Sequence, residues 1–325
     1  MSGYREPDLR RLRTVAIGAR PNKVDRTLLA RVPGADRSFH AFLDSLPHVL
    51  AADHLRTVAA AIAMAAGEGR GVVLLVGGHV IKTGLGPLLA DWVRQGLVTH
   101  VAMNGAAAIH DFELAAFGGT SEDVESGLKD GTFGMAEETG SAMNAAVKQA
   151  HAAGQGLGEG LAASLAARVE LPGGDISLLL ACRERGIPVT VHATIGADII
   201  HQHPMADGAA VGDTSHRDFR RLAGSLPDLH GGGVVLNLGS AVVLPEVFLK
   251  ALTIARNLGA GKPTGFLAAD FDMIRHYRPQ MNVVERPTRE GGTGLLFTGH
   301  HELLLPLLVW AVGDARREAS GVRRQ

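Results

Sequence analysis

The sequence predicts an α/β protein built around a doubly wound, mostly parallel sheet, with an N-terminal helical extension. Short apolar runs such as Val72–Val76 and Val234–Leu238 are typical of strands that are buried on both faces of a parallel sheet. A helical pattern follows the first run, because Leu89, Trp92 and Val93 share one face of a helix. Strands and helices therefore alternate along the chain, which favours βαβ units.

The N-terminal part differs in character from the rest. Residues 1–35 are basic, contain proline and are only weakly periodic, which indicates an arm that lies on the body or on a neighbouring subunit. A helical pattern begins near Ser38, and His54–Gly67 is an alanine-rich helix. We therefore expect an N-terminal arm with helices over residues 1–70 and one continuous α/β unit over residues 71–325.

The elements of the α/β unit follow from the same patterns. The first βαβ unit runs from Gly71 to Asp111, with its second strand at Val98–Met103. Residues 112–140 are rich in Gly, Ser, Thr and acidic residues and predict a long functional loop, in which Ser121–Leu128 can form a helix. The later elements are a helical stretch over residues 141–170, helices at Ile176–Arg185, Val247–Leu258 and Glu302–Val312, and strands at Ile187–His192, Val234–Leu238, Thr264–Ala269 and Gly294–Thr298.

Composition limits the classes of function. The 325 residues are 46% hydrophobic and 20% charged, which is typical of a globular protein. The net charge of −1 gives no support for binding nucleic acid or an anionic membrane. We find no transmembrane run and no secretory signal, so we expect a soluble, cytoplasmic protein. The single cysteine, Cys182, excludes an intramolecular disulfide framework and a CxxC site.

Small and polar residues follow several of the predicted strands. In open α/β sheets this edge binds ligands, and the start of a helix there suits a pyrophosphate. Lys82 lies in the first of these turns, where it either contacts phosphate or points to solvent. The candidate cofactor-binding residues are Gly78, His79, Thr83, Asn104, Gly105, Gly239, Ser240 and Asp272.

Titratable residues near the same strand ends are candidates for proton transfer. His110 and Asp111 form a potential general acid/base pair, although Asp111 could instead cap a helix. A second pair of adjacent histidines could shuttle protons near neutral pH. The candidate catalytic residues are His110, Asp111, Asp198, His300 and His301.

A further group of histidines surrounds Asp198. His192, His201 and His203 could bind Zn, Fe or Ni, or they could line a polar cavity or a subunit contact. We assign no metal ligands on this pattern alone.

Four blocks of the sequence, spread over residues 70–312, resemble the deoxyhypusine synthase family. The blocks are GGHVIKTGLGPLLADWVRQGLVTHVAMNGAA, GIPVTVHATIGADIIHQH, GGGVVLNLGSAVVLPEVFLKALTIARNLGA, and TGFLAADFDMIRHYRP with GLLFTGHHELLLPLLVWAV. The resemblance implies a Rossmann-like fold that binds NAD without a GxGxxG fingerprint. It also implies a homotetramer with active sites at subunit interfaces, and it places Asp198 and Asp272 at aspartates of the family.

One departure from the family concerns its chemistry. The lysine that forms an imine in that family precedes the last strand, and the matching stretch VVERPTREGG contains no lysine. Arg286 and Arg289 are the nearest basic residues there, and arginine is a poor imine-forming nucleophile. We therefore expect an NAD-binding enzyme with a changed substrate site. It would carry out redox-neutral transfer or elimination on a small amine- or hydroxyl-bearing molecule through transient hydride transfer.

Several alternatives remain open at this point. One is a deoxyhypusine or homospermidine synthase-type aminobutyl transferase with a relocated lysine, for which Lys82 is a candidate. Another is an ornithine-cyclodeaminase-like enzyme, which is also redox-neutral with NAD. A third is a non-catalytic nucleotide-binding scaffold, and a metal-dependent hydrolase is a more distant fourth.

Overall fold

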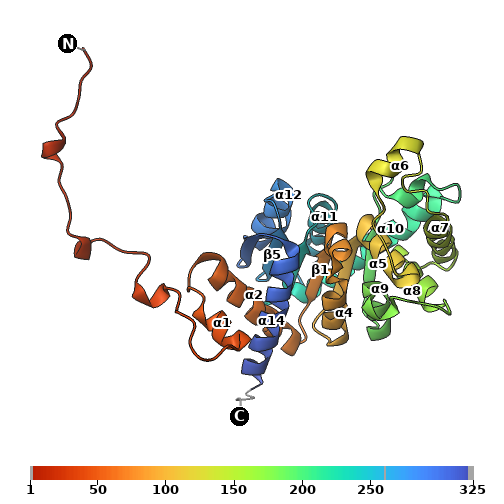
Figure 1. The fold of residues 1–325 in the computed structure, drawn as a ribbon, viewed down its shortest axis with the longest axis horizontal. Coiled ribbons are helices and arrows are strands. Elements are labelled where there is room, and N and C mark those ends of the chain that lie inside the picture. The colour runs from red at the N-terminus through yellow and green to blue at the C-terminus, as the bar shows by residue number, and fades with distance from the viewer. Residues whose placement is uncertain (1–2, 260, 321–325) are drawn as a thin grey trace. The chain divides into compact units, whose positions relative to one another are not determined.

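The computed structural model describes residues 3–259 and 261–320 (Figure 1). The chain divides into two compact units, Met1–Asp53 and His54–Gln325, which we describe separately. Among the described residues, no helix is both long enough and apolar enough to span a bilayer.

The first unit is an extended chain with single helical turns, followed by a short helix. The turns are η1 (Leu9–Arg11), η2 (Ile17–Ala19) and η3 (Arg26–Leu28), and the helix is α1 (Phe39–Ser45). Ser38 caps α1, because its hydroxyl accepts a hydrogen bond from the backbone N–H of Ala41. The next helix, α2 (Leu50–Gly67), begins in this unit and continues into the second.

The second unit contains a six-stranded sheet in which every strand pair is parallel. The strand order is β3-β2-β1-β4-β5-β6, which is the order of Rossmann-type sheets and confirms the predicted doubly wound architecture. The chain moves outward from β1 to β3 and then returns to the other side of β1, so the order switches between β1 and β4. The strands are β1 (Val72–Val76), β2 (His100–Asn104), β3 (Val189–His192), β4 (Val234–Leu238), β5 (Leu267–Asp272) and β6 (Thr293–Thr298).

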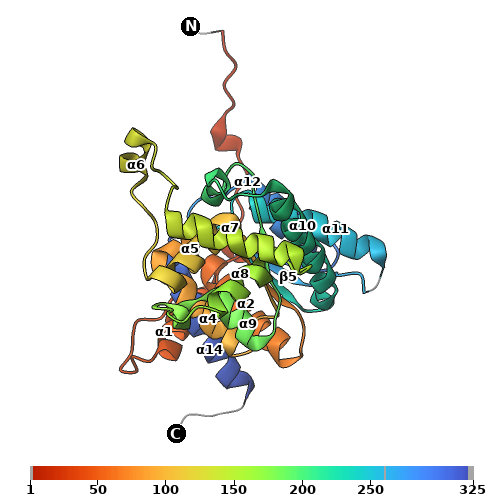
Figure 2. The same cartoon turned by 90° about the vertical axis from the view of Figure 1, so that its right-hand side faces the viewer.

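Helices connect the strands and cover the sheet. On one face, Val73, Leu75 and Val235 of the sheet pack with Leu222 and Phe248 in a cluster of buried apolar side chains. The helices α10 and α11, which supply the last two residues, lie side by side (Figure 2). The helical elements of this unit after α2 are α3 (Gly78–Val80), η4 (Ile81–Leu85), α4 (Gly86–Arg94), α5 (Gly105–Phe117), α6 (Val124–Asp130), α7 (Glu137–Ala152), α8 (Leu157–Ala166), η5 (Gly174–Ile176), α9 (Leu178–Arg185), η6 (Ile199–Gln202), α10 (Gly208–Ser225), η7 (Leu226–Leu229), α11 (Val243–Leu258), α12 (Tyr277–Pro279), η8 (Gln280–Glu285), α13 (Arg286–Thr288) and α14 (His301–Ala319).

The elements differ from the sequence-based prediction in several places, of which three bear on the arrangement of polar residues. The expected loop over residues 112–140 is partly helical, because α5 continues to Phe117 and ends only where Gly118 adopts a left-handed φ of 76°. The strand β5 extends to Asp272, which places two aspartates inside the strand. The prediction missed α10, whose three glycines and many charged residues weaken its helical pattern, although Asp207 caps it.

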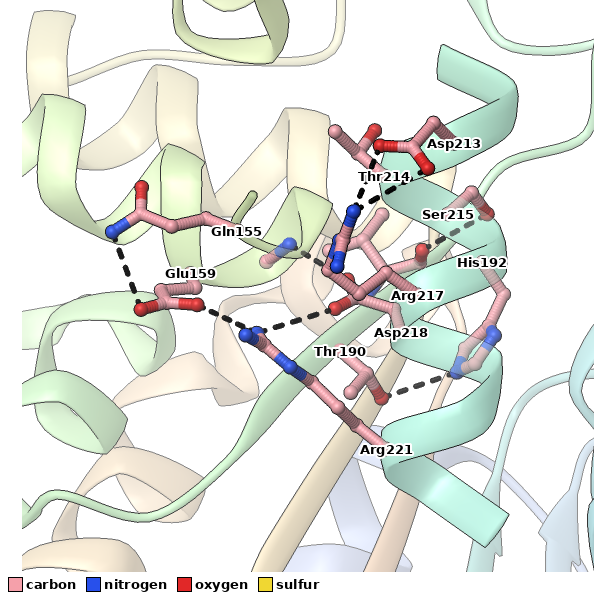
Figure 3. A network of polar contacts seen from close by, with 12 residues as sticks. Gln155, Glu159, Thr190, His192, Asp213, Thr214, Ser215, Arg217, Asp218 and Arg221 are labelled. Carbon is pink, nitrogen blue, oxygen red and sulfur yellow. Dashed lines mark hydrogen bonds and ion pairs between the residues drawn. The ribbon is translucent and has the colours of Figure 1, made fainter. Parts of the chain in front are cut away.

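A buried aspartate on α10 closes the free edge of β3 (Figure 3). The Asp218 carboxylate accepts hydrogen bonds from the backbone N–H groups of Val191, on β3, and Gly158, in the first turn of α8, both at 2.8 Å. One turn earlier, the Ser215 hydroxyl donates to the Val191 carbonyl at 3.2 Å. The edge strand therefore bonds to side chains of α10 instead of exposing its backbone to a second sheet.

Asp218 has incomplete compensation for its burial. Its second oxygen, Oδ1, has no hydrogen-bond partner among the described residues, and Arg221 Nη1 lies 3.8 Å away. That guanidinium is shared with Glu159, at 2.7 Å (Figure 3). Burial raises the pKa of Asp218 to about 7, although the two backbone hydrogen bonds and Arg221 oppose the shift.

We predict that Asp218→Asn removes a pH dependence of stability. The folded protein keeps the Asp218 proton up to about pH 7, whereas the unfolded chain releases it near 3.8. Protonation thus favours the folded state at low pH. As pH rises from about 4 to 7, the free energy of unfolding of the wild type should fall relative to the variant. The fall should be up to about 1.4 kcal/mol per pH unit. Urea unfolding at several pH values measures the difference.

Asp213→Asn is the matched control on the same helix. Hydrogen bonds from His151 and Arg217 lower the pKa of exposed Asp213, so this carboxylate is ionised in both states over the same pH range. This control should follow the wild-type curve. Parallel curves for the wild type and Asp218→Asn would contradict the assignment of the proton to Asp218.

Candidate functional site

The turns after β1 and β4 meet at the switch in strand order. A side chain at Gly77 would place its Cβ 2.1 Å from the Gly239 carbonyl oxygen, so only glycine allows this approach. The Gly77 N–H donates to the Leu238 carbonyl at 2.9 Å, and Gly239 has a left-handed φ of 65°. We call the ends of β1, β4 and β5 together with the start of α14 the switch-point edge.

Buried polar groups gather at the switch-point edge. The Asn237 amide donates to the Asp270 carboxylate at 2.7 Å and to the Ser240 carbonyl at 3.0 Å. Burial raises the pKa of Asp270 to about 7, and the negative charge of Asp272 adds to the shift. Among the described residues, Asn237 Oδ1 and His301 Nδ1 are buried without hydrogen-bond partners. A molecule bound at this edge would give these two atoms hydrogen-bond partners.

Two histidines face each other at this edge. The rings of His79 and His301 have centroids 5.5 Å apart. His301 Nε2 lies 3.0 Å from the Phe271 carbonyl oxygen, which can only accept, so Nε2 carries a hydrogen. Burial lowers the pKa of His79, and positive charge at His301 and Lys82 lowers it further. The neighbouring His300 is exposed, with its Nδ1 3.6 Å from Glu302, and occupies the N-cap position of α14.

A cavity of about 270 Å³ lies beyond the end of β2. One face of α5 forms a wall of the cavity, because Ala106, Ile109, His110 and Glu113 follow helical spacing. Four charged side chains line it: Lys82, Glu113, Glu122 and Asp198. The remaining lining residues come from the segment around α6 and from the loop before η6, and are Ser121, Val124, Phe133, Ala136, Ala197 and Ile199.

The cavity is next to the switch-point edge. A Cβ at Gly78 would lie 2.8 Å from Ala106 Cβ, so the turn after β1 packs on the first turn of α5. The positive charge of Lys82 lowers the pKa of both His79, at the edge, and His110, in the cavity. Lys82 therefore lies within electrostatic reach of both parts of the site.

Asp198 occupies the side of the cavity next to β2. Its Oδ2 accepts from the Thr194 N–H at 2.9 Å, and burial raises the pKa of this carboxyl group. A Cβ at Gly105 would lie 2.1 Å from the same oxygen. The glycine that follows β2 thus makes room for the Asp198 carboxylate.

Three predicted cofactor-binding side chains form hydrogen bonds to the nearby backbone. The Thr83 hydroxyl donates to the His79 carbonyl at 2.8 Å, and Asn104 caps α5 by accepting from Ala107 N–H at 2.9 Å. Asp272 accepts from the Met273 N–H at 2.7 Å. These side chains shape the backbone around the site.

The structure separates Asp111 from its neighbour His110. The buried Asp111 carboxylate accepts from the Ser177 hydroxyl at 2.7 Å and from the N–H groups of Leu178 and Leu179 at 2.8 and 3.0 Å. It therefore caps α9, the helix packed beside α5. We leave Asp111 out of the proposed reactive groups, because all of these contacts lie away from the cavity.

The other predicted histidines lie in three different environments. His192 is buried, with Nε2 3.1 Å from the Thr190 hydroxyl, and burial lowers its pKa to about 3. His203 packs against Gly140, whereas both ring nitrogens of His201 are buried without partners among the described residues. Within the described part of the chain, these histidines and Asp198 do not bring three ligand atoms within 4.8 Å of one another.

Some lining residues were not singled out by the sequence analysis. Glu113 lies one helical turn after His110, a spacing that places both on one face. Glu122 belongs to the segment that the sequence predicted as a functional loop, and only the folding of that segment over α5 brings it to the cavity.

Comparison with known proteins assigns no family to the chain. No protein-family model and no curated protein matches it. Three solved structures that it resembles are the arginine dihydrolase ArgZ of the ornithine–ammonia cycle in cyanobacteria (18% identity, TM-score 0.49), AgrE in a ternary complex with ornithine and NAD+ (17%, 0.49), and a protein assigned as a deoxyhypusine synthase from Entamoeba histolytica (11%, 0.47).

The aligned regions differ in extent. They cover 82%, 80% and 87% of this chain, respectively, and 33%, 33% and 97% of the three other proteins. The chain thus spans about a third of the length of ArgZ and AgrE. Likenesses with such low identities and TM-scores carry no argument about activity, and the fold assignment rests on the strand order itself.

We predict that Gly105→Ala destabilises the protein by about 2 kcal/mol, because the new methyl group meets the Asp198 carboxylate. In an Asp198→Ala background the same change should cost at least about 1 kcal/mol less, because its obstacle is gone. Chemical unfolding of the four proteins in this double-mutant cycle measures the coupling.

Gly212→Ala is the control, since nothing lies within 4 Å of a Cβ at this position in α10. It should leave stability unchanged or slightly increased, because alanine favours helix. Additive effects of Gly105→Ala and Asp198→Ala on the free energy of unfolding would show that the new methyl group does not clash with the Asp198 carboxylate.

Proposed function

We propose that the protein is an NAD-binding enzyme that acts on a small, positively charged amine by redox-neutral transfer or elimination. The observation that carries the proposal is the position of a cavity with three carboxylates directly beside the switch-point edge of a Rossmann-type sheet. A dinucleotide bound at that edge would have its reactive end close to a substrate in the cavity.

The residues at the switch-point edge fit a dinucleotide. Gly78 and His79 begin the helical segment after β1, where backbone N–H groups favour phosphate. The unpaired buried atoms Asn237 Oδ1 and His301 Nδ1 are an acceptor and a ring nitrogen that a bound group could satisfy. When bound, NAD would supply a hydride acceptor, and this chain would supply the orientation of both molecules.

The charges of the cavity favour a cationic substrate. Glu113, Glu122 and Asp198 oppose the single positive charge of Lys82. An ammonium group would therefore gain from three carboxylates in a partly enclosed space, where the effective dielectric constant is lower than in water. A hydroxyl-bearing substrate fits the same chemistry if it also carries an amine.

His110 is the group best placed to move protons in the cavity. Burial lowers its pKa, with positive charge at Lys82 acting in the same direction and Glu113 against it. A neutral imidazole can accept a proton from the substrate amine and return it later. The two carboxylates Glu122 and Asp198 would hold the rest of the substrate.

The position of Lys82 in the cavity supports a second candidate function. It is the lysine that lines the cavity, so it could take the role of the imine-forming lysine that is missing from residues 283–292. An aminobutyl transferase with a relocated lysine would then use the same cavity. Mass spectrometry after borohydride treatment tests this, because reduction would trap a substrate carbon on Lys82.

We predict saturable binding of NAD to the purified, nucleotide-free protein in calorimetric titrations. His79→Ala should weaken NAD affinity about tenfold or more, because it removes a side chain of the first turn at the switch-point edge. Glu122→Gln should leave NAD affinity unchanged, since Glu122 lines only the cavity. Absence of NAD binding to folded protein would overturn the proposed function and favour a non-catalytic scaffold.

The same variants separate the two halves of the site. With NAD present, a panel of diamines and basic amino acids should bind more tightly than neutral molecules of equal length. Glu122→Gln should reduce that preference about tenfold. Equal affinity for charged and neutral molecules would show that the carboxylates do not select the substrate, and ammonia release would favour the cyclodeaminase-like alternative.

A further inference from the structure

A threonine hydroxyl lies between His110 and Glu113, two side chains that line the cavity. The chain leaves α5 at Gly118, whose left-handed φ of 76° turns it back along the helix. This turn places the Thr120 hydroxyl 2.8 Å from His110 Nδ1 and in hydrogen-bond contact with Glu113 Oε2. Thr120, ten positions after His110 in the sequence, therefore connects two side chains of α5.

Hydrogen-bond chemistry fixes the direction of this chain of contacts. An ionised carboxylate can only accept, so the Thr120 hydroxyl donates its one hydrogen to Glu113. The same oxygen must then accept from His110, which requires a hydrogen on Nδ1. In the neutral imidazole, Nε2 is then the nitrogen with a free lone pair, and it has no hydrogen-bond partner among the described residues.

The Glu113 carboxylate is held at both oxygens. Its other oxygen, Oε1, accepts from the Thr139 hydroxyl of α7 at 2.8 Å, and Thr139 is buried. The carboxylate therefore cannot turn away from Thr120 without losing a second hydrogen bond. Three elements, α5, α7 and the segment after Gly118, thus fix one orientation of the His110 ring.

We propose that Thr120 is a positioning residue that keeps His110 in the Nδ1–H form, so that Nε2 is the proton acceptor for a substrate in the cavity. The identity of the proton donor, a substrate amine, rests on the proposed function. The orientation of the His110 ring rests only on the hydrogen bonds to Thr120 and Glu113. Glu113 acts through Thr120 as the fixed anion of a carboxylate–hydroxyl–imidazole relay.

The proton-transfer step balances within the named groups. The substrate N–H bond breaks, its electron pair stays on the substrate nitrogen, and the proton forms a new bond to His110 Nε2. The imidazole becomes an imidazolium, whose Nδ1–H still donates to Thr120. No proton leaves Thr120, and the negative charge of Glu113 stabilises the positive ring.

Charges from several elements act on His110. Burial lowers its pKa, Glu113, which is on α5 with His110, raises it, and Lys82, in the kinked helix after β1, lowers it. Glu122 and Asp198 face the same cavity from two loops. Removing the relay should therefore change both the position of the ring hydrogen and the pKa of His110.

Nitrogen-15 NMR of histidine-labelled full-length protein tests the relay, with His110 identified by the signal that His110→Gln removes. We expect the Nδ1–H form at His110 in the wild type at neutral pH. Thr120→Val should give a mixture of the two neutral forms and a lower His110 pKa, because the path to Glu113 is broken. Thr120→Ser, which keeps the hydroxyl, should behave as the wild type.

Two further variants make the test specific. Glu113→Gln should lower the His110 pKa by removing the negative charge, and Thr253→Val, an exposed change on α11, should have no effect. A wild-type His110 with its hydrogen on Nε2, or no change in Thr120→Val, would overturn the proposal. The NMR measurement needs no NAD, so failure of NAD binding would overturn the proposed function and leave this result standing.

Discussion

The close approach of the β1 and β4 turns is the constraint on which the rest of the site depends. Gly77 lies against the Gly239 carbonyl, and Gly78 lies against Ala106, so the turns after β1 and β4 and the start of α5 pack closely where the first turn carries no side chain. This packing brings His79 opposite His301 and directs Lys82 toward the cavity wall of α5. A larger residue at either glycine would separate the strand ends and with them both halves of the site.

Burial of polar groups without full compensation is the second physical theme. Asp270 at the switch-point edge and Asp218 at the edge of β3 both have pKa values raised to about 7 by burial. The two carboxyls nevertheless differ in their surroundings. Asp218 holds two backbone N–H groups and closes the sheet, whereas Asp270 is bonded to Asn237, which retains an unpaired oxygen. Asp218 therefore has a structural role at the sheet edge, and Asp270 belongs to the polar cluster at the switch-point edge.

Two different elements form the walls of the cavity: the helix α5, and the segment around α6 that crosses over it. Along α5, His110 and Glu113 are held by helix geometry and by the hydroxyl of Thr120. Glu122 and Phe133 belong to the segment that crosses over them, and Glu122 Oε1 accepts from the Gly134 N–H at 2.9 Å, which ties the two ends of that segment together. Glu113 is therefore positioned by the hydroxyls of Thr120 and Thr139, and Glu122 by the turn at Gly134. The sheet does not contact either carboxylate through these hydrogen bonds.

The sequence by itself determined the parallel sheet and the positions of the tight turns after its strands. Apolar runs such as Val72–Val76 and Val234–Leu238 identify buried parallel strands because both faces must exclude water, and glycines after them identify the tight turns. Tertiary structure alone decided which polar residues act together. Asp111 and His110 are neighbours in sequence but point in different directions around α5. Thr120 contacts His110 from the loop after that helix, and Asp198 reaches the cavity from a distant segment. The local sequence pattern predicts strands, helices and turns. Contacts between separate segments depend on the path of the whole chain across the sheet, which the local pattern does not contain.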